Sequence, residues 1–242
     1  MQQIRRSAER GYADHGWLKS FHTFSFADYF DPQHVEFGPL RVINEDRVQP
    51  GAGFGTHAHR DMEILTYVLS GALAHKDSMG NGSTIRPGDV QRMSAGRGVQ
   101  HSEFNGSNSE PVHFLQIWIM PNERGIESSY EERHFGAQER RGRLRLIASP
   151  DRAQRSLLIH QDARVYAGLF DGAETATLEV APGRRLYLHV ARGQISADGV
   201  TLAAGDALTL TDTSTLLLRD AREAEVLVFD LPGASARASA AG

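Results

Sequence analysis

The 242-residue sequence predicts an all-β protein made of two small β-barrels. Short runs of β-branched and aromatic residues recur along the chain and are separated by glycine, proline, aspartate and asparagine, a pattern typical of sandwiches and barrels. Long amphipathic helical patterns are not evident. The order strand, glycine, strand, Gly-Asp also occurs twice, which indicates that one barrel unit is repeated.

The predicted strands are spread over the whole chain. In order they cover residues 64–69, 112–120, 143–147, 164–170, 185–190 and 224–231. The clearest turn signals between strands are Pro50-Gly51, residues 78–83, Pro87-Gly88-Asp89, Pro182-Gly183 and Gly205-Asp206. Glycine and proline at such positions end strands because of their special backbone conformations.

The repeat divides the chain. Residues 67–71 (Tyr-Val-Leu-Ser-Gly) precede Pro87-Gly88-Asp89, and residues 188–193 (Leu-His-Val-Ala-Arg-Gly) precede Ala204-Gly205-Asp206. We therefore expect one domain over residues 1–135 and a second over 136–232. Residues 233–242 are almost entirely alanine, serine, glycine and arginine, and we expect a flexible tail there.

Composition excludes several classes of protein. Lysine plus arginine total 26 against 30 acidic residues, a net charge of -4, so the basic surface of a nucleic-acid binder is missing. No apolar stretch approaches the roughly 20 residues that span a bilayer, and no signal peptide is evident, so we expect a cytoplasmic protein without membrane contact. Cysteine is absent, which removes disulfides and thiolate ligands. We expect a monomer, because the two barrels can bury faces against each other.

Two pairs of metal-ligand residues stand out: His57 and His59, then His101 and Glu103. Residues i and i+2 of a strand point to the same side, so each pair can direct both side chains at one point. Two such strands facing each other would form a metal site. Three imidazoles with a carboxylate suit one borderline or fairly hard divalent ion, such as iron(II), manganese, cobalt, nickel, copper(II) or zinc.

Glu63 competes with Glu103 for the carboxylate position, since residues 57, 59 and 63 share parity; it could be a ligand or an acceptor for a ligand imidazole. We expect Glu103 to be the ligand. Four other histidines have no partner at ligand spacing and are interpreted as strand or surface residues: His75, His113, His160 and His189. Aligning Gly193 with Gly71 places Glu179 and Ala181 where the first half has His57 and His59, so we expect a second half without metal.

Five segments together resemble the pirin family of the cupin superfamily. They are residues 38–46 (GPLRVINED), 53–63 (GFGTHAHRDME), 75–81 (HKDSMGN), 88–96 (GDVQRMSAG) and 101–103 (HSE). The resemblance extends from Asp14 to about Tyr130 and implies a bicupin, with two jelly-roll-like double-stranded β-helix barrels packed face to face. The general cupin pattern matches His57, His59 and Glu63, then His101 and Asn105. The pirin pattern implies the ligands His57, His59, His101 and Glu103, with iron(II) as the first choice of metal.

Within the family, the chain resembles bacterial pirins with quercetin 2,3-dioxygenase activity. The resemblance implies a flavonol-like aromatic substrate, dioxygen, and Glu103 as the catalytic group that takes the proton of the 3-hydroxyl. The alternative is a metal-binding regulatory protein that docks a protein partner without turnover. A different cupin activity, isomerase or decarboxylase, would need a cation near the metal, for which Arg60, Lys76 and Arg92 are the candidates.

Overall fold

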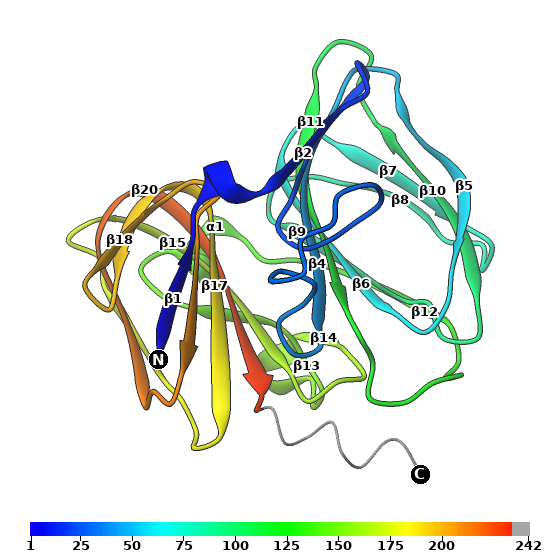
Figure 1. Cartoon of the computed structure of the whole chain (residues 1–242). Coiled ribbons are helices and arrows are strands. Elements are labelled where there is room, and N and C mark those ends of the chain that lie inside the picture. The colour runs from blue at the N-terminus through cyan, green and yellow to red at the C-terminus, as the bar shows by residue number, and fades with distance from the viewer. Residues whose placement is uncertain (234–242) are drawn as a thin grey trace. The chain divides into compact units, whose positions relative to one another are not determined.

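A computed structural model describes residues 1–233 of the chain, and strands dominate it (Figure 1). Strands make up 59% of the structure and helices 4%, so the all-β prediction is confirmed. Of the expected tail, residues 234–242 lie outside the described part of the chain.

The chain forms two compact units. The N-terminal unit contains Arg10–His134 and Leu157–Gln161, and the C-terminal unit contains Met1–Glu9, Phe135–Ser156 and, within the described residues, 162–233. The first residues belong to the C-terminal unit because the strand Gln2–Arg5 pairs with residues 207–210. The expected division after residue 135 stays a prediction.

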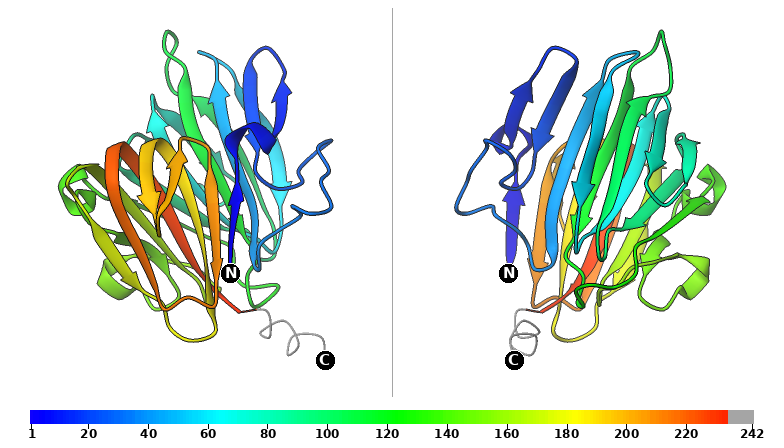
Figure 2. Two further views of the ribbon diagram at one scale, coloured as in Figure 1. Left: turned by 60° about the vertical axis from the view of Figure 1, so that its left-hand side comes forward. Right: turned by 90° about the vertical axis from the view of Figure 1, so that its right-hand side faces the viewer.

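Two antiparallel sheets make up the N-terminal unit. Its strands are β2 (Gly11–Asp14), β3 (Leu18–His22), β4 (Leu40–Val48), β5 (Gly53–His59), β6 (Glu63–Ser70), β7 (Leu73–Asp77), β8 (Gly82–Ile85), β9 (Asp89–Ser94), β10 (Val99–Asn105), β11 (Val112–Ile119), β12 (Ser129–His134) and β14 (Leu157–Leu158). The larger sheet has the order β12-β9-β6-β11-β4-β3-β2, the smaller has the order β5-β10-β7-β8, and β14 belongs to neither. Figure 2 shows β2 and β3, in dark blue, extending the larger sheet beyond β4.

The C-terminal unit is built around a second large antiparallel sheet. Its elements are β1 (Gln2–Arg5), the 3-10 turn Ser7–Glu9, α1 (Ala137–Arg140), β13 (Arg145–Ser149), the 3-10 turn Ala153–Arg155, β15 (Arg164–Gly172), β16 (Ala176–Glu179), β17 (Arg184–Ala197), β18 (Val200–Ala203), β19 (Ala207–Thr211) and β20 (Thr215–Pro232). The sheet order is β1-β19-β17-β20-β15-β13, with β16 paired to β20 and β18 paired to β17.

Each predicted strand lies within or overlaps an observed one, but β17 and β20 are much longer than predicted. Both change partners along their length: the first half of β20 pairs with β16 and its last half with β15. Asp220 and Glu223 have positive φ angles of 52° and 45°, which bend β20 between its two halves. Such bulges turn a strand while it stays paired. They interrupt the alternation of inward and outward side chains, so the sequence pattern predicts a strand end where the strand continues.

The internal repeat is visible in the strand pairing. In the N-terminal unit β6 pairs with β9 and β7 with β8; in the C-terminal unit the first half of β17 pairs with β19 and its second half with β18. Gly71 and Gly193 stand at matching turns with φ of 79° and 66°, a backbone conformation that glycine adopts without steric cost. The same chain path therefore occurs in both units.

The interiors of the two units differ. The core of the C-terminal unit is apolar, with Leu186, Leu188 and Val190 of β17 packed against Val226 and Val228 of β20. In the N-terminal unit, one row across the larger sheet is polar instead. This polar band consists of residues that lie opposite one another on successive strands: His22, Asn44, Gln116, Thr66 and Gln91.

Every member of the polar band is buried. Apolar residues continue the same face on one side of the band, among them Leu18, Val48, Val68 and Phe114. Because side chains alternate between the two faces of a strand, the band belongs to the inner face of the sheet. Buried polar groups are retained where they are hydrogen-bonded or used by a ligand, so the band marks the part of this unit with a function beyond packing.

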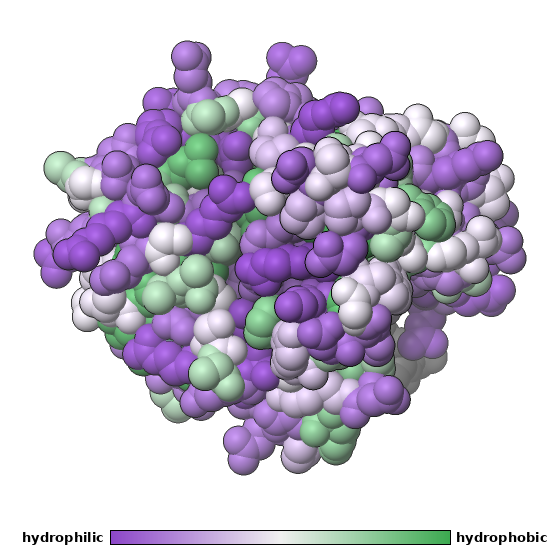
Figure 3. Space-filling view, turned by 90° about the horizontal axis from the view of Figure 1, so that it is seen from above, coloured by the Kyte–Doolittle hydropathy of each residue, from purple (hydrophilic) through white to green (hydrophobic). Residues whose placement is uncertain are grey.

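Figure 3 shows a face on which hydrophilic side chains prevail and hydrophobic ones are scattered. Within residues 1–233, no helix has the length and apolar character needed to cross a membrane.

A buried ion pair connects the first residue of the N-terminal unit, Arg10, with β4 of the larger sheet. Arg10 Nη1 donates to Glu45 Oε2 at 2.9 Å, and the two side chains are 3% and 8% exposed. His113 Nε2 lies 2.9 Å from Glu45 Oε1, and Arg47 Nη2 lies 2.7 Å from the same oxygen. Burial raises the pKa of Glu45, but the hydrogen bond with His113 and the charges of Arg10 and Arg47 outweigh it, so the pKa lies well below its usual range.

We expect Glu45→Gln to lower the free energy of unfolding near neutral pH by roughly 3 kcal/mol, because it removes the carboxylate from a buried ion pair with Arg10. A carboxyl with a depressed folded-state pKa stabilises the fold above its unfolded pKa and loses that contribution as pH falls. The difference between wild type and variant should therefore shrink below about pH 4.5. Urea denaturation at several pH values measures it.

The control is Lys19→Gln, which removes the partner of an exposed pair, Lys19 and Asp14, separated by 3.9 Å. This variant should unfold at nearly the wild-type urea concentration. A Glu45→Gln protein that is as stable as Lys19→Gln at neutral pH would contradict the role given to the buried pair.

Candidate metal centre

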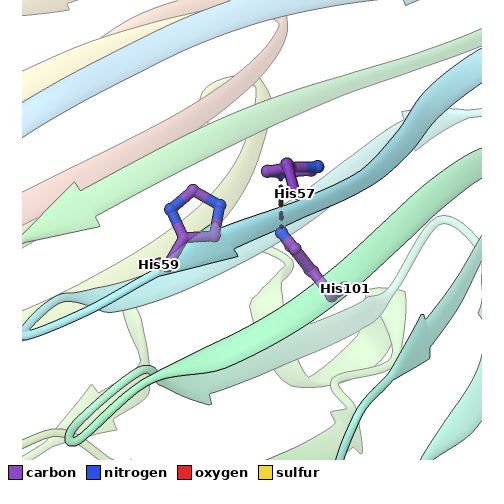
Figure 4. Close-up of side chains that lie close together, drawn as sticks. All are labelled: His57, His59 and His101. Carbon is purple, nitrogen blue, oxygen red and sulfur yellow. Dashed lines mark hydrogen bonds between the residues drawn. The ribbon is translucent and has the colours of Figure 1, made fainter.

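The two predicted ligand pairs lie on neighbouring strands of the smaller sheet. His57 and His59 are on β5 and His101 is on β10, which pairs with β5 in an antiparallel manner so that His101 stands opposite His57. Figure 4 shows the three imidazoles gathered on one side of these strands. We had expected the two strands to face each other; they are adjacent instead. Residues directly opposite each other on paired strands have Cβ atoms about 4.5–5.5 Å apart, so their side chains can meet.

A β-bulge separates His101 from Glu103. His101 pairs with His57 and Glu103 pairs with Phe54, so three steps on β5 match two on β10. Bulges turn individual side chains away from strict alternation and are frequent beside functional sites. On its other edge β10 pairs with β7, where Glu103 stands opposite His75. The three predicted imidazoles and Glu103 thus come from two strands, and a third strand adds a histidine.

The three histidines are close enough to share one ion. One nitrogen from each of His57, His59 and His101 lies within 4.8 Å of the others. The Nε2 atoms of His57 and His101 are 3.0 Å apart, the contact dashed in Figure 4. Two nitrogens bound to one cation at about 2.1 Å are about 3 Å apart when they subtend a right angle.

Hydrogen bonds assign the tautomer of His57, because its Nδ1 donates to the carbonyl of Gly55 at 2.8 Å and its Nε2 therefore carries the lone pair. His75 Nε2 donates to Asp77 Oδ2 at 3.3 Å, so His75 Nδ1 is an acceptor. Gln91 Nε2 at 3.2 Å and His101 Nδ1 at 3.4 Å both lie within reach of that one lone pair. Without a metal, His101 Nε2 can donate to His57 Nε2 at 3.0 Å.

With its proton on Nδ1 and directed at His75, His101 would present a second lone pair beside that of His57 Nε2. A metal-bound histidine donates its other N–H to a fixed acceptor in this way. The cluster of imidazoles, with His57 Nδ1 already held by the carbonyl of Gly55, fits a divalent metal.

The imidazoles are also in the protonation state that metal binding needs. Burial, and to a smaller extent the charge of His57, lowers the pKa of His59 to about 4. Burial, followed by the neighbouring histidines, lowers the pKa of His101 to about 3. Both rings are neutral at pH 7, and neutral imidazole is the form that ligates.

Glu103 is fully enclosed beside this cluster. Gln116 Nε2 donates to its Oε2 at 2.9 Å, and Thr66 Oγ1 lies 3.4 Å from its Oε1. Burial, with the hydrogen bond from Gln116 opposing it and the charge of Asp46 adding to it, raises the pKa of Glu103 to about 7. Its carboxylate lies with His75 and His101 in a second group of donors within 4.8 Å of one another. His101 is the member common to both groups.

His75 lies closer to the site than its sequence position predicted. We interpreted it as a strand or surface residue; it is on a strand, but it is buried and contacts His101. Gln91 Nε2 donates to it at 3.2 Å, and the ring of Tyr130 stacks on it with centroids 5.1 Å apart. The signal was the spacing His75-x-Asp77, which is the same alternation that marked the ligand pairs.

Glu63, the competing carboxylate, is engaged elsewhere. It is fully buried and accepts a hydrogen bond from Ser94 at 2.8 Å, while His160 Nδ1 lies 3.2 Å from its other oxygen. Asn105, the general cupin match, supports the backbone by donating to the carbonyls of Val48 and Glu110. Both residues have clear local partners.

A cavity of about 260 Å³ opens beside the cluster. Its walls combine the metal-ligand candidates with aromatic and polar residues: His57, His59, Glu103, Phe26, Phe54, Trp118, His22, Asn44, Asp46, Gln116, His15, Leu18, Ser20 and Ala27. Phe26 packs edge-on against Trp118, with centroids 5.4 Å apart, and Trp118 in turn meets His59 at 5.0 Å. Phe104, which follows Glu103 on β10, is 42% exposed.

Comparison with known proteins agrees with this geometry. Residues 3–119 match the family model described as Pirin, and residues 146–231 match the Quercetinase C-terminal cupin domain. The curated quercetin 2,3-dioxygenase of Escherichia coli K12 is 46% identical over 232 residues, which cover 96% of this chain and 99% of that protein.

Solved structures give the same result. The crystal structure of YhhW from E. coli superposes with a TM-score of 0.92 at 45% identity, covering 96% of this chain and 98% of the other. The structure titled bacterial pirin YhhW in complex with nickel(II) gives a TM-score of 0.91 at 45% identity, covering 96% and 100%. The fold, the donor cluster and these relatives together show a two-cupin protein with a site suited to a divalent metal, and the chain belongs to the pirin family.

Proposed function

We propose that this protein is a metal-dependent dioxygenase that opens the central ring of a flavonol such as quercetin with dioxygen and releases carbon monoxide. The observation that carries the proposal is the meeting of neutral imidazoles and a buried carboxyl at the wall of an aromatic-lined cavity. The relatives named quercetin 2,3-dioxygenase support the same chemistry.

In this proposal His57, His59, His101 and Glu103 hold one divalent ion. Iron(II) remains our first choice; the nickel(II) complex of the E. coli relative supports nickel, and cobalt, copper, manganese and zinc are alternatives. A bound divalent ion would supply Lewis-acid chemistry toward the oxygens of the flavonol and of dioxygen. We assign metal binding to the N-terminal unit, since Glu179 and Ala181 take the places of His57 and His59 in the repeat.

Glu103 is the proposed catalytic residue. Burial raises the pKa of Glu103 to about 7 when no metal is bound. A divalent cation at the site would lower the pKa of the carboxyl and favour the carboxylate, which is the form that accepts a proton. Gln116 holds Oε2 by a 2.9 Å hydrogen bond, whereas the contact of Oε1 with Thr66 is longer, at 3.4 Å. Oε1 is therefore the atom better placed to accept the proton of the 3-hydroxyl.

The cavity walls orient and shield the substrate. Phe26, Phe54 and Trp118 offer flat apolar surfaces for an aromatic ring system. They also keep bulk water away from the electron-rich anionic flavonol that reacts with dioxygen, which opens the central ring to give a depside and carbon monoxide.

The isomerase or decarboxylase alternative receives no support from its cations. Arg92 is 1% exposed and bonds Ser94, Ser129 and Glu131. Arg60 and Lys76 are exposed and are not among the described residues that line the cavity. If the activity test fails, the regulatory alternative, in which the protein binds a protein partner without turnover, would replace the dioxygenase proposal. We also propose that the protein is a monomer and that it is located in the cytoplasm.

Alanine at His57 or at His101 should weaken nickel(II) binding at least about 100-fold, because loss of a residue that merely supports a ligand already costs 10- to 100-fold. Anaerobic calorimetry on metal-stripped protein, with elemental analysis after dialysis, measures it. The control is His134→Ala, which removes an exposed histidine paired with Asp89. A full equivalent of tightly bound nickel in both site variants would rule out these ligands.

Metal-stripped protein reloaded separately with iron(II), nickel, copper or manganese should degrade quercetin in air and release carbon monoxide with at least one ion. Glu103→Gln removes the base while keeping the side-chain shape, and kcat should fall by roughly 10²- to 10⁴-fold. Flavonol absorbance and carbon monoxide are followed together, with His134→Ala as the matched control. Absence of turnover above the His57→Ala level with every ion would refute the dioxygenase proposal.

A further inference from the structure

Four buried polar atoms at the cavity have no hydrogen-bond partner among the described residues. They are Nδ1 of His22, Oδ1 of Asn44, Oδ1 of Asp46 and Nε1 of Trp118. Asn44 and Asp46 are only 4% and 5% exposed. Such groups are rare in folded proteins because an unsatisfied buried donor or acceptor is costly.

All four residues line the same cavity as His57, His59 and Glu103. Asn44 and Asp46 are two residues apart on β4, so their side chains point the same way, and His22 stands opposite Asn44 on β3. The unsatisfied atoms of these four residues thus meet at one cavity wall, while others among the described residues, such as Arg92 Nε, lie elsewhere. This arrangement is expected where a ligand supplies the missing partners.

The chemistry of the wall defines the ligand. Two oxygens on adjacent inward positions of β4 accept hydrogen bonds, and the indole N–H of Trp118 donates one. The described lining holds no lysine or arginine, while Asp46 and Glu103 both face it. A carboxylate or phosphate would meet these acidic groups unfavourably, whereas phenolic hydroxyls can donate to them.

We propose that Asn44 and Asp46 form a recognition pair that accepts hydrogen bonds from hydroxyl groups of an aromatic ligand, with Trp118 donating to one of its oxygens. The inference rests on the proposed function and narrows its substrate class: the site selects flavonols that carry hydroxyls on the outer rings. Both residues touch the ligand directly. A site that hydrogen-bonds a hydroxyl rejects analogues that lack it, because its own groups are then left unpaired.

Binding of two flavonols to the nickel-loaded full chain without dioxygen tests this. Quercetin carries hydroxyls on both outer rings, whereas 3-hydroxyflavone keeps the 3-hydroxyl and 4-carbonyl and lacks the others. The ratio of their affinities isolates the outer hydroxyls from metal contact and ring packing. Asn44→Leu and Asp46→Leu remove each acceptor with little change in volume, Asp46→Asn keeps an acceptor oxygen, and Thr177→Leu on exposed β16 is the control.

Wild type and Thr177→Leu should bind quercetin at least about tenfold more tightly than 3-hydroxyflavone, the effect of one hydrogen bond. Each leucine variant should lower this ratio several-fold, because it removes one of the two acceptors, while its affinity for 3-hydroxyflavone and its nickel content stay at wild-type levels. Asp46→Asn should keep most of the preference. If a leucine variant does not fold, the alanine variant of the same residue replaces it.

Equal binding of both flavonols by wild type, or a tenfold preference unchanged in both leucine variants, overturns the recognition pair and leaves the dioxygenase proposal standing. Failure of wild type to bind either flavonol overturns the flavonol substrate itself, and with it this inference. The two failures are therefore told apart by the wild-type protein alone.

Discussion

The burial of polar side chains inside one barrel is the constraint on which the site depends. His22, Asn44, Gln116, Thr66 and Gln91 form a row across five strands, and a buried row of this kind is tolerated only when its groups find partners. At one end Gln116 and Thr66 hold Glu103, and Gln91 holds His75. At the other end, His22 and Asn44 have atoms free to meet a ligand.

The two units show what this constraint changes. Both follow the same strand path. The first half of β17 corresponds to β6 and its second half to β7, while β18 corresponds to β8 and β19 to β9. The core cluster of the C-terminal unit consists of apolar residues, leucine and valine prominent among them, and contributes stability by burying apolar area. In the N-terminal unit the polar band replaces part of that packing by hydrogen bonds and leaves a cavity. The same fold thus encloses an apolar core in the C-terminal unit and a polar cavity in the N-terminal unit.

Much of this could be predicted from sequence, because strands, turns and i, i+2 pairs are local patterns. The Gly71 and Gly193 turns, the strands around them and the clustering of His57, His59 and His101 were confirmed. Pairing between distant strands is not local, so the contact of β1 with β19 and the side-by-side placement of β5 and β10 could not be foreseen. Asn44 and Asp46 belong to the segment 38–46, which resembles the pirin family in sequence. Only the register of β3, β4 and β11 shows that the two side chains share a cavity wall.

The structure also offers two places for an ion, and deciding between them tests the account most directly. A crystal structure of the nickel-loaded protein with anomalous diffraction at the nickel edge would locate the metal. The account predicts one peak bonded to Nε2 of His57 and of His101, to His59 and to a carboxylate oxygen of Glu103. A peak held by the second donor group, His75, His101 and Glu103, with His57 and His59 unbound, would contradict it.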